Sequence, residues 1–354
     1  MHCISLLRHS NKFFISSSYG KPSANISISA KTYADEIEKN ISSSPPRDIN
    51  HQYDSTIMNQ MCKLPQGLSS LHLYVYTEIF QAILFNQFLK PCKTLLFTMH
   101  NEGLINCIKQ IKQDSAEDIY YNFDLKVKKF TRNEIYAFNK LKKIYENTID
   151  LLVFDLSDIF NKCTYSKTLI SIVCNIIDYQ KNSGSCIIKM GDLHQKPVLD
   201  IIYILNYFYK KLVIMSPTIN SSDKYLVCVE YCSADYSKYL AELEIILRES
   251  PSEELSAILS TDLPMLFLNK IDDFNITTCS SRLSSNDQIS SLYMSKQSLE
   301  KIEEYKKNTL IRCSQWFSKH KIPHHKHPFE TDNIFLFNAE KQSVSHENIF
   351  LTAK

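Results

Sequence analysis

Glycine is scarce in this chain, with 5 among 354 residues. Loops that hold phosphate groups against bare backbone depend on clustered glycines, and the sequence contains no P-loop motif. The 11 cysteines are scattered and never form a CxxC pair, which argues against a zinc site and favours a reducing compartment. No apolar run reaches the roughly 18–20 residues that a membrane-spanning helix needs. These absences argue against a phosphate-loop protein, a zinc-ribbon protein and a membrane-spanning protein.

Excess charge of one sign is also missing. The chain carries 40 lysines and arginines against 38 aspartates and glutamates, a net charge of +2. Bulk charge therefore does not indicate a nucleic-acid-binding protein. The length suits one large domain with extensions, or two domains.

The first 66 residues are rich in serine, asparagine and proline, and no acidic residue precedes Asp35. This composition is compatible with a mitochondrial transit peptide or with a polar arm. We expect a mostly irregular extension over 1–66. We place the protein in the cytoplasm, which would be a host cytoplasm if the source is viral, with the mitochondrion as the alternative.

Short apolar runs alternate with helical patterns between Thr94 and Met215. This alternation predicts an α/β domain with a mostly parallel sheet, which we place over 67–235. The turn at 216–223 is too short for a crossover helix, so the last two strands should be antiparallel. The expected strands are 94–98, 151–154, 186–188, 211–215 and 225–229, and the expected helices are 71–89, 104–111, 133–147, 168–180 and 197–209.

Residues 236–354 change in character, and we expect a helical region that ends in a polar tail and offers a surface to a protein partner. Helices are predicted at 237–248, 252–260 and 297–320. The histidine-rich stretch HKIPHHKH that begins at His320 is interpreted as an exposed basic tail rather than a metal site. No metal is predicted.

Charged side chains follow three of the expected strands or turns. Asp155 follows the run Leu151 to Phe154, Lys189 follows Cys186 to Ile188, and Asp223 ends the polar turn. Open α/β sheets bind ligands beyond the carboxyl ends of their strands, so these residues form a candidate site. Local sequence alone favours a solvated strand-end lysine at Lys189, and Asp223 could be an ordinary turn residue.

The combination of these segments resembles the FtsJ-type ribose 2′-O-methyltransferases, which include viral and cellular mRNA cap methyltransferases. It is most similar to the branch found in large DNA viruses. The resemblance is strongest over about 151–228 and weaker back to Leu71. It implies a Rossmann-like, S-adenosylmethionine-dependent methyltransferase fold. The segments that carry it are LLVFDLSD with Asp155, GSCIIKMGDLHQKP with Lys189, and SPTINSSDKYLVC with Pro217 and Asp223.

That family uses a Lys-Asp-Lys-Glu tetrad, and the resemblance implies that Asp155, Lys189 and Asp223 are the catalytic residues. A ribose 2′-hydroxyl is a poor nucleophile. A neighbouring lysine can orient the hydroxyl and help to remove its proton, while flanking acids hold the amine.

The chain departs from the family pattern at three places. Asp223 stands where the family has glutamate, and the first lysine of the tetrad falls on Val75, although Glu78 keeps a later acid of that segment. The glycine-rich cofactor loop is eroded to Thr98–Leu104, in which only Gly103 remains. The resemblance implies that S-adenosylmethionine is held by Thr98, His100, Asn101, Gly103 and Asp155.

Two functions follow from this resemblance. The first is an RNA 2′-O-methyltransferase, most simply one that acts on capped mRNA, with RNA as its partner. The second is a relative that has lost the chemistry and serves as an RNA- or protein-binding scaffold. The missing lysine and the eroded loop motivate the second hypothesis.

Overall fold

The computed structural model describes most of the chain up to residue 325. The residues it describes are 1–9, 13–43, 55–63, 70–84, 91–98, 101–112, 117–122, 147–155, 165–220, 222–232, 236–249, 254–294 and 299–325. The helix predicted at 133–147 falls almost entirely outside these ranges. The predicted polar tail lies outside them from residue 326 onward.

A seven-stranded mixed sheet forms the centre of the molecule, in the order β1-β7-β8-β6-β5-β3-β4. Four adjacent strands, β4, β3, β5 and β6, are parallel to one another. β8 is antiparallel to both β6 and β7. The predicted Rossmann-like α/β fold with an antiparallel last strand is confirmed. The strands are β1 (His2–Leu7), β3 (Lys93–Thr98), β4 (Ile119–Asn122), β5 (Ile149–Asp155), β6 (Gln180–Met190), β7 (Tyr209–Ser216) and β8 (Lys224–Tyr231).

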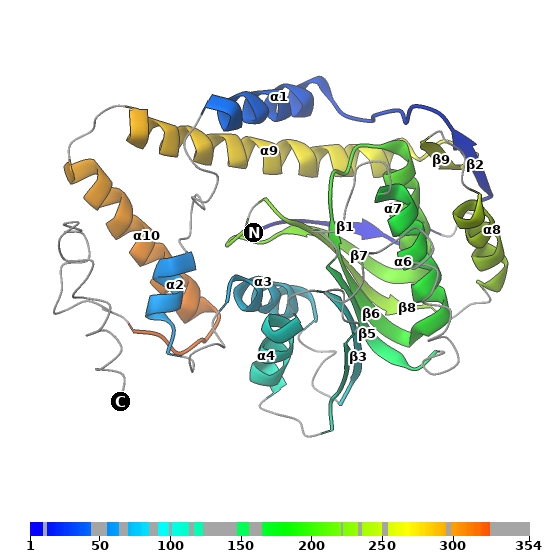
Figure 1. The fold of residues 1–354 in the computed structure, drawn as a ribbon, viewed down its shortest axis with the longest axis horizontal. Helices are drawn as coiled ribbons and strands as arrows, with labels where there is room; N and C mark the ends of the chain where they lie inside the picture. Colours follow the sequence, from blue (N-terminus) through cyan, green and yellow to red (C-terminus); the bar gives the residue numbers. More distant parts are fainter. Residues whose placement is uncertain are drawn as a thin grey trace.

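Helices cover both faces of the sheet (Figure 1). One face packs against α6 (Tyr165–Tyr179) and α7 (Lys196–Phe208), and the other against α3 (Leu71–Ile79) and α4 (Asn101–Lys112). Successive side chains of a strand point to opposite faces, so Ile188 joins the α7 core and Ile187 the α3 core. The same alternation turns Lys189 toward the α3 face.

The N-terminal segment is more ordered than the sequence suggested. β1 pairs with β7 and forms an edge of the main sheet, and β2 (Ile15–Tyr19) pairs with a later strand, β9 (Leu255–Leu259). Helix α1 (Ile28–Ser43) lies along α9 (Met265–Met294), and α2 (Ser55–Met61) contacts α10 (Leu299–Lys319) (Figure 1). The expectation of irregular chain is wrong for these elements, because distant partners stabilise them and their own sequence carries only a weak signal.

Residues after 236 are helical in part. α8 (Ser237–Arg248) and α10 match predicted helices, whereas the 30-residue helix α9 was not predicted. The helix predicted at 252–260 is wrong, since the strand β9 occupies 255–259. The stretch from His320 is also not simply an exposed tail, because His320 is 7% exposed. The domain boundaries near 66 and 235 stay predictions.

Candidate functional site

Lys189 lies at the next-to-last position of β6 and faces the α3 side of the sheet. Its side chain is 12% exposed, and its Nζ lies 2.9 Å from Asp223 Oδ2 and 3.7 Å from Asp155 Oδ1. The structure thus brings together the three side chains that the sequence singled out. Their catalytic role stays a prediction.

Strand register explains why Asp155 and Lys189 meet. β5 and β6 are parallel, and Phe154 is in register with Ile188, so Asp155 and Lys189 follow at the same edge. Asp155 is the last residue of β5, and its side chain is 2% exposed. A carboxylate this deeply buried needs an opposite charge close by, and Lys189 supplies one.

Asp223 comes from the turn between β7 and β8. Its Oδ2 accepts hydrogen bonds from Asn220 Nδ2 at 2.9 Å and from the Tyr225 hydroxyl at 3.4 Å. Burial raises the pKa of Asp223, the charge of Asp155 raises it further, and Lys189 opposes both effects. The net rise means that the ammonium group only partly offsets the cost of burying a second carboxylate.

Tyr76 is a site residue that the sequence did not reveal. It lies on α3, is fully buried, and packs its ring edge-on against Tyr225 with 6.3 Å between ring centroids. Burial and the charges of Asp155 and Asp223 raise the pKa of Tyr76 well above its usual value. Tyr76 therefore presents a neutral O–H next to two carboxylates.

Val75 does not replace the missing lysine. Its side chain is 2% exposed and belongs to the apolar core between α3 and the sheet. The phase of an isolated helix does not reveal which of two adjacent residues will face a site. The sequence therefore gave no signal that Tyr76, rather than position 75, would lie beside the acids.

The expected cofactor residues lie around the end of β3. Thr98 is the last residue of β3, is 4% exposed, and is in register with Asp155. Helix α4 begins three residues later at Asn101, so a helix N-terminus follows the strand at the ligand-binding edge. His100 lies outside the described residues. A strand end, a buried acid and a helix start at one edge fit the methionine portion of S-adenosylmethionine.

Gly103 has a different use. A Cβ at this position would come within 2.9 Å of His72 Cβ and 3.0 Å of Ser70 Oγ, at the start of α3. The glycine is therefore required for α4 to pack against α3. A role of Gly103 in cofactor binding stays a prediction.

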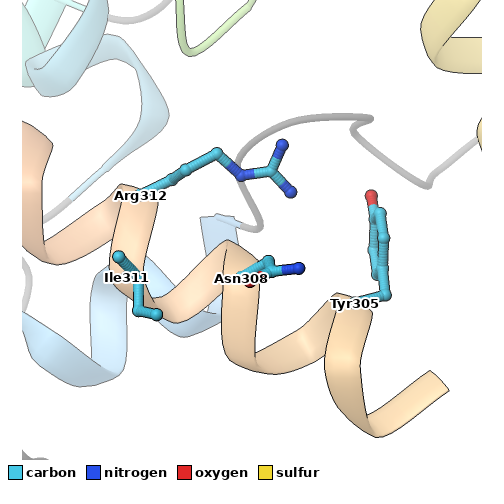
Figure 2. A pocket seen from close by; sticks show the side chains of 4 residues that line it. All are labelled: Tyr305, Asn308, Ile311 and Arg312. Carbon is cyan, nitrogen blue, oxygen red and sulfur yellow. The ribbon is translucent and has the colours of Figure 1, made fainter. Parts of the chain in front are cut away.

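The structure also has a surface pocket away from the candidate site. A surface pocket lies along α10, and its lining residues are Tyr305, Asn308, Ile311 and Arg312 (Figure 2). It contains none of the predicted site residues.

Across the described ranges, no group of three or more histidine, cysteine, aspartate or glutamate residues could hold a metal ion. Nor does any described helix combine the length and apolarity needed to cross a membrane.

Comparison with known proteins adds little. No protein-family model matches the chain, and no curated protein matches it. Among solved structures 27 chains match. One is a Plasmodium falciparum protein provisionally described as a ribosomal RNA methyltransferase, with 14% identity and a TM-score of 0.32 over 45% of this chain and 98% of the other. A TM-score of this size is too low to support an inference about function.

Proposed function

We propose that this protein is an S-adenosylmethionine-dependent RNA ribose 2′-O-methyltransferase and that its substrate is capped mRNA. One observation carries the proposal: Lys189 Nζ lies between Asp155 and Asp223 at the carboxyl edge of the parallel strands. The sequence resemblance implied this arrangement, and it is the one that activating a ribose hydroxyl requires.

In the proposed reaction the 2′-oxygen bonds to a methyl carbon as the carbon–sulfur bond breaks, and the sulfur keeps the electron pair. Lys189 first loses a proton to solvent, and its neutral Nζ then orients the hydroxyl and accepts its proton. Asp155 and Asp223 stabilise the ammonium that results. When bound, S-adenosylmethionine supplies an electrophilic methyl group on a sulfonium. Thr98, Asp155 and the start of α4 would hold it.

The charge of the site differs from that of the family pattern. With all groups ionised, Asp155, Asp223 and Lys189 sum to −1, whereas a Lys-Asp-Lys-Glu tetrad sums to zero. The first lysine of the family's tetrad has no counterpart here. The group next to the carboxylates of Asp155 and Asp223 is instead the neutral hydroxyl of Tyr76. We expect the extra negative charge to favour a positively charged ligand at this edge, as the sulfonium is.

The first prediction is that Lys189→Ala folds and loses methyl transfer to capped RNA by about 10²–10⁴-fold, the usual contribution of a general base. The measurement is transfer of a labelled methyl group from S-adenosylmethionine to capped and uncapped RNA. Lys181→Ala is the matched control. Lys181 lies at the other end of β6 and pairs with Asp150 at 3.0 Å. Wild-type activity in Lys189→Ala would refute the mechanism.

A second candidate function is a scaffold without catalysis. The observations that favour it are the core position of Val75 and the use of Gly103 for helix packing. Titration calorimetry with S-adenosylmethionine separates the two functions. Micromolar binding supports the enzyme. No binding at millimolar cofactor, together with retained RNA or protein binding, supports the scaffold.

A further inference from the structure

Glu78 is a buried acid outside the catalytic group. It lies on α3, two residues after Tyr76, and is 2% exposed. Its Oε2 accepts a hydrogen bond of 2.6 Å from the backbone N–H of Thr218, and its Oε1 accepts one of 2.6 Å from Trp316 Nε1. The two oxygens therefore join the turn between β7 and β8 to helix α10.

The turn held by Glu78 is the one that carries Asp223. Two residues after Thr218, Asn220 donates its side-chain amide to Asp223 Oδ2 at 2.9 Å and accepts the Asp223 backbone N–H at 3.2 Å. Asp223 in turn contacts Lys189 at 2.9 Å. Trp316 is thus connected to Lys189 through Glu78, the backbone from Thr218 to Asn220, and Asp223.

Stability alone does not readily explain a carboxylate at this place. No described lysine or arginine forms a salt bridge with Glu78, and its two hydrogen bonds come from neutral donors. Removing a carboxylate from water is costly, and two neutral hydrogen bonds compensate for that cost only in part. Charge-assisted hydrogen bonds do, however, fix geometry closely.

We propose that Glu78 is a positioning residue for Asp223, and that α10, through Trp316, is part of the support of the active site. Trp316 fixes the carboxylate of Glu78, and Glu78 fixes the Thr218–Asn220 turn. The turn then sets the distance between Asp223 and Lys189. The catalytic part of this inference rests on the proposed methyltransferase function.

The chain offers a matched control for the test. Gln81 lies in the π-helical segment η1 (Phe80–Leu84) that follows α3, and it contacts the residue after α10. Its Nε2 donates to the His320 carbonyl at 3.0 Å, and its Oε1 lies 2.7 Å from His320 Nδ1. Among the described residues, no hydrogen bond connects Gln81 to the 216–223 turn. Gln81→Met therefore removes a helix-to-helix connection of the same kind and leaves the turn unchanged.

The kinetic test compares Glu78→Gln, Trp316→Phe and Gln81→Met. A carboxylate displaced by about 1 Å can lower the rate a hundredfold, so we expect Glu78→Gln to lower kcat on the order of tenfold to a hundredfold with KM for RNA unchanged. Trp316→Phe keeps the Thr218 contact and should lower kcat less. Gln81→Met should keep wild-type kcat. Equal kcat in all three folded variants would overturn the proposal.

A second measurement does not depend on activity. Nitrogen-15 NMR of the lysine amines, with the Lys189 signal assigned by its loss in Lys189→Ala, follows the titration of this amine. We expect Glu78→Gln and Trp316→Phe to shift the pH midpoint of that signal, and Gln81→Met to leave it in place. If the wild type methylates nothing, the proposed function fails while this signal still tests the positioning role.

The outcomes separate positioning from simple stabilisation. An unchanged Lys189 titration in a folded Glu78→Gln protein, even one with a lower melting temperature, would mean that Glu78 only stabilises the fold. If Glu78→Gln does not fold, Trp316→Phe decides by the same signal, since it retains both the carboxylate and the Thr218 contact.

Discussion

Asp223 reaches Lys189 although its side chain is one methylene shorter than that of glutamate. The 2.9 Å contact arises because the turn places the Asp223 backbone close to β6, where Tyr225 is in register with Lys189. The reach of a side chain depends on the position of its backbone, so side-chain length alone does not decide whether residue 223 contacts Lys189.

At the residue scale we predict that Asp223→Glu lowers methyl transfer. The added methylene extends the carboxylate by about 1.3–1.5 Å, and a displacement of this size costs roughly tenfold to a hundredfold in rate. The measurement is kcat on capped RNA, with Asp223→Asn alongside to separate the loss of charge from the change in length. Activity at or above the wild-type level in Asp223→Glu would show that the turn adapts to either acid.

Part of the candidate site could be predicted at this scale. Asp155 and Lys189 each follow an apolar run, and parallel strands end at a common edge, so their proximity follows from pattern. Tyr76 and Glu78 could not be found in this way. Their positions depend on the rotation of α3 about its axis, and the contacts of Glu78 are with residues 140 and 238 positions away.

Among the elements, β9 shows how a tertiary contact decides local structure. The side chain of Asp200, on α7, accepts hydrogen bonds from the backbone N–H groups of Ile258 at 2.9 Å and Leu259 at 3.1 Å. It also forms a salt bridge with Lys196. Burial raises the pKa of Asp200 despite these donors. One carboxylate thus holds the two-stranded β2–β9 sheet against the main domain.

We predict that Asp200→Ala lowers the free energy of unfolding by about 2–5 kcal/mol, because it leaves two buried N–H groups and a lysine without their acceptor. Asp200→Asn keeps an oxygen for the backbone donors and should lose much less. Urea denaturation measures both, and hydrogen exchange at Ile258 and Leu259 localises the change. Equal losses in the two variants would contradict this account of β9.

Elements with strong patterns were predictable, and elements defined by their partners were not. The buried strands β5, β6 and β8 contain apolar runs, which predict a strand from sequence. β9 was interpreted as a helix because its five residues, LSAIL, carry no strand pattern of their own. β1 was not predicted, because this short strand is defined by its pairing with β7, which the sequence alone does not reveal.

On the scale of the whole molecule, α10 and the N-terminal elements are built onto the sheet domain. His320, at the end of the α10 segment, is buried against Trp316 with 4.4 Å between ring centroids. Burial, with a smaller effect of Lys319, lowers the pKa of His320 from 6.5 to about 4. We therefore expect acid to weaken the attachment of α10.

We predict that stability falls between about pH 6.5 and pH 4. Above this range His320 is neutral in both states. Within it the unfolded chain binds a proton that the folded chain does not, so the free energy of unfolding falls, by about 3 kcal/mol in total. Denaturation at several pH values measures the slope. His320→Gln should flatten it relative to the exposed-residue control His325→Gln, and an identical slope in both would argue against His320.

The pairing of β1 with β7 has a consequence for how the protein is made. His2 pairs with Ser216, so β1 is synthesised 214 residues (216 − 2) before its neighbour exists. Until then its backbone groups are open to other chains, and such long-range closure is slow. A variant without this strand would expose β7 as an unpaired edge strand, through which molecules can aggregate by strand pairing.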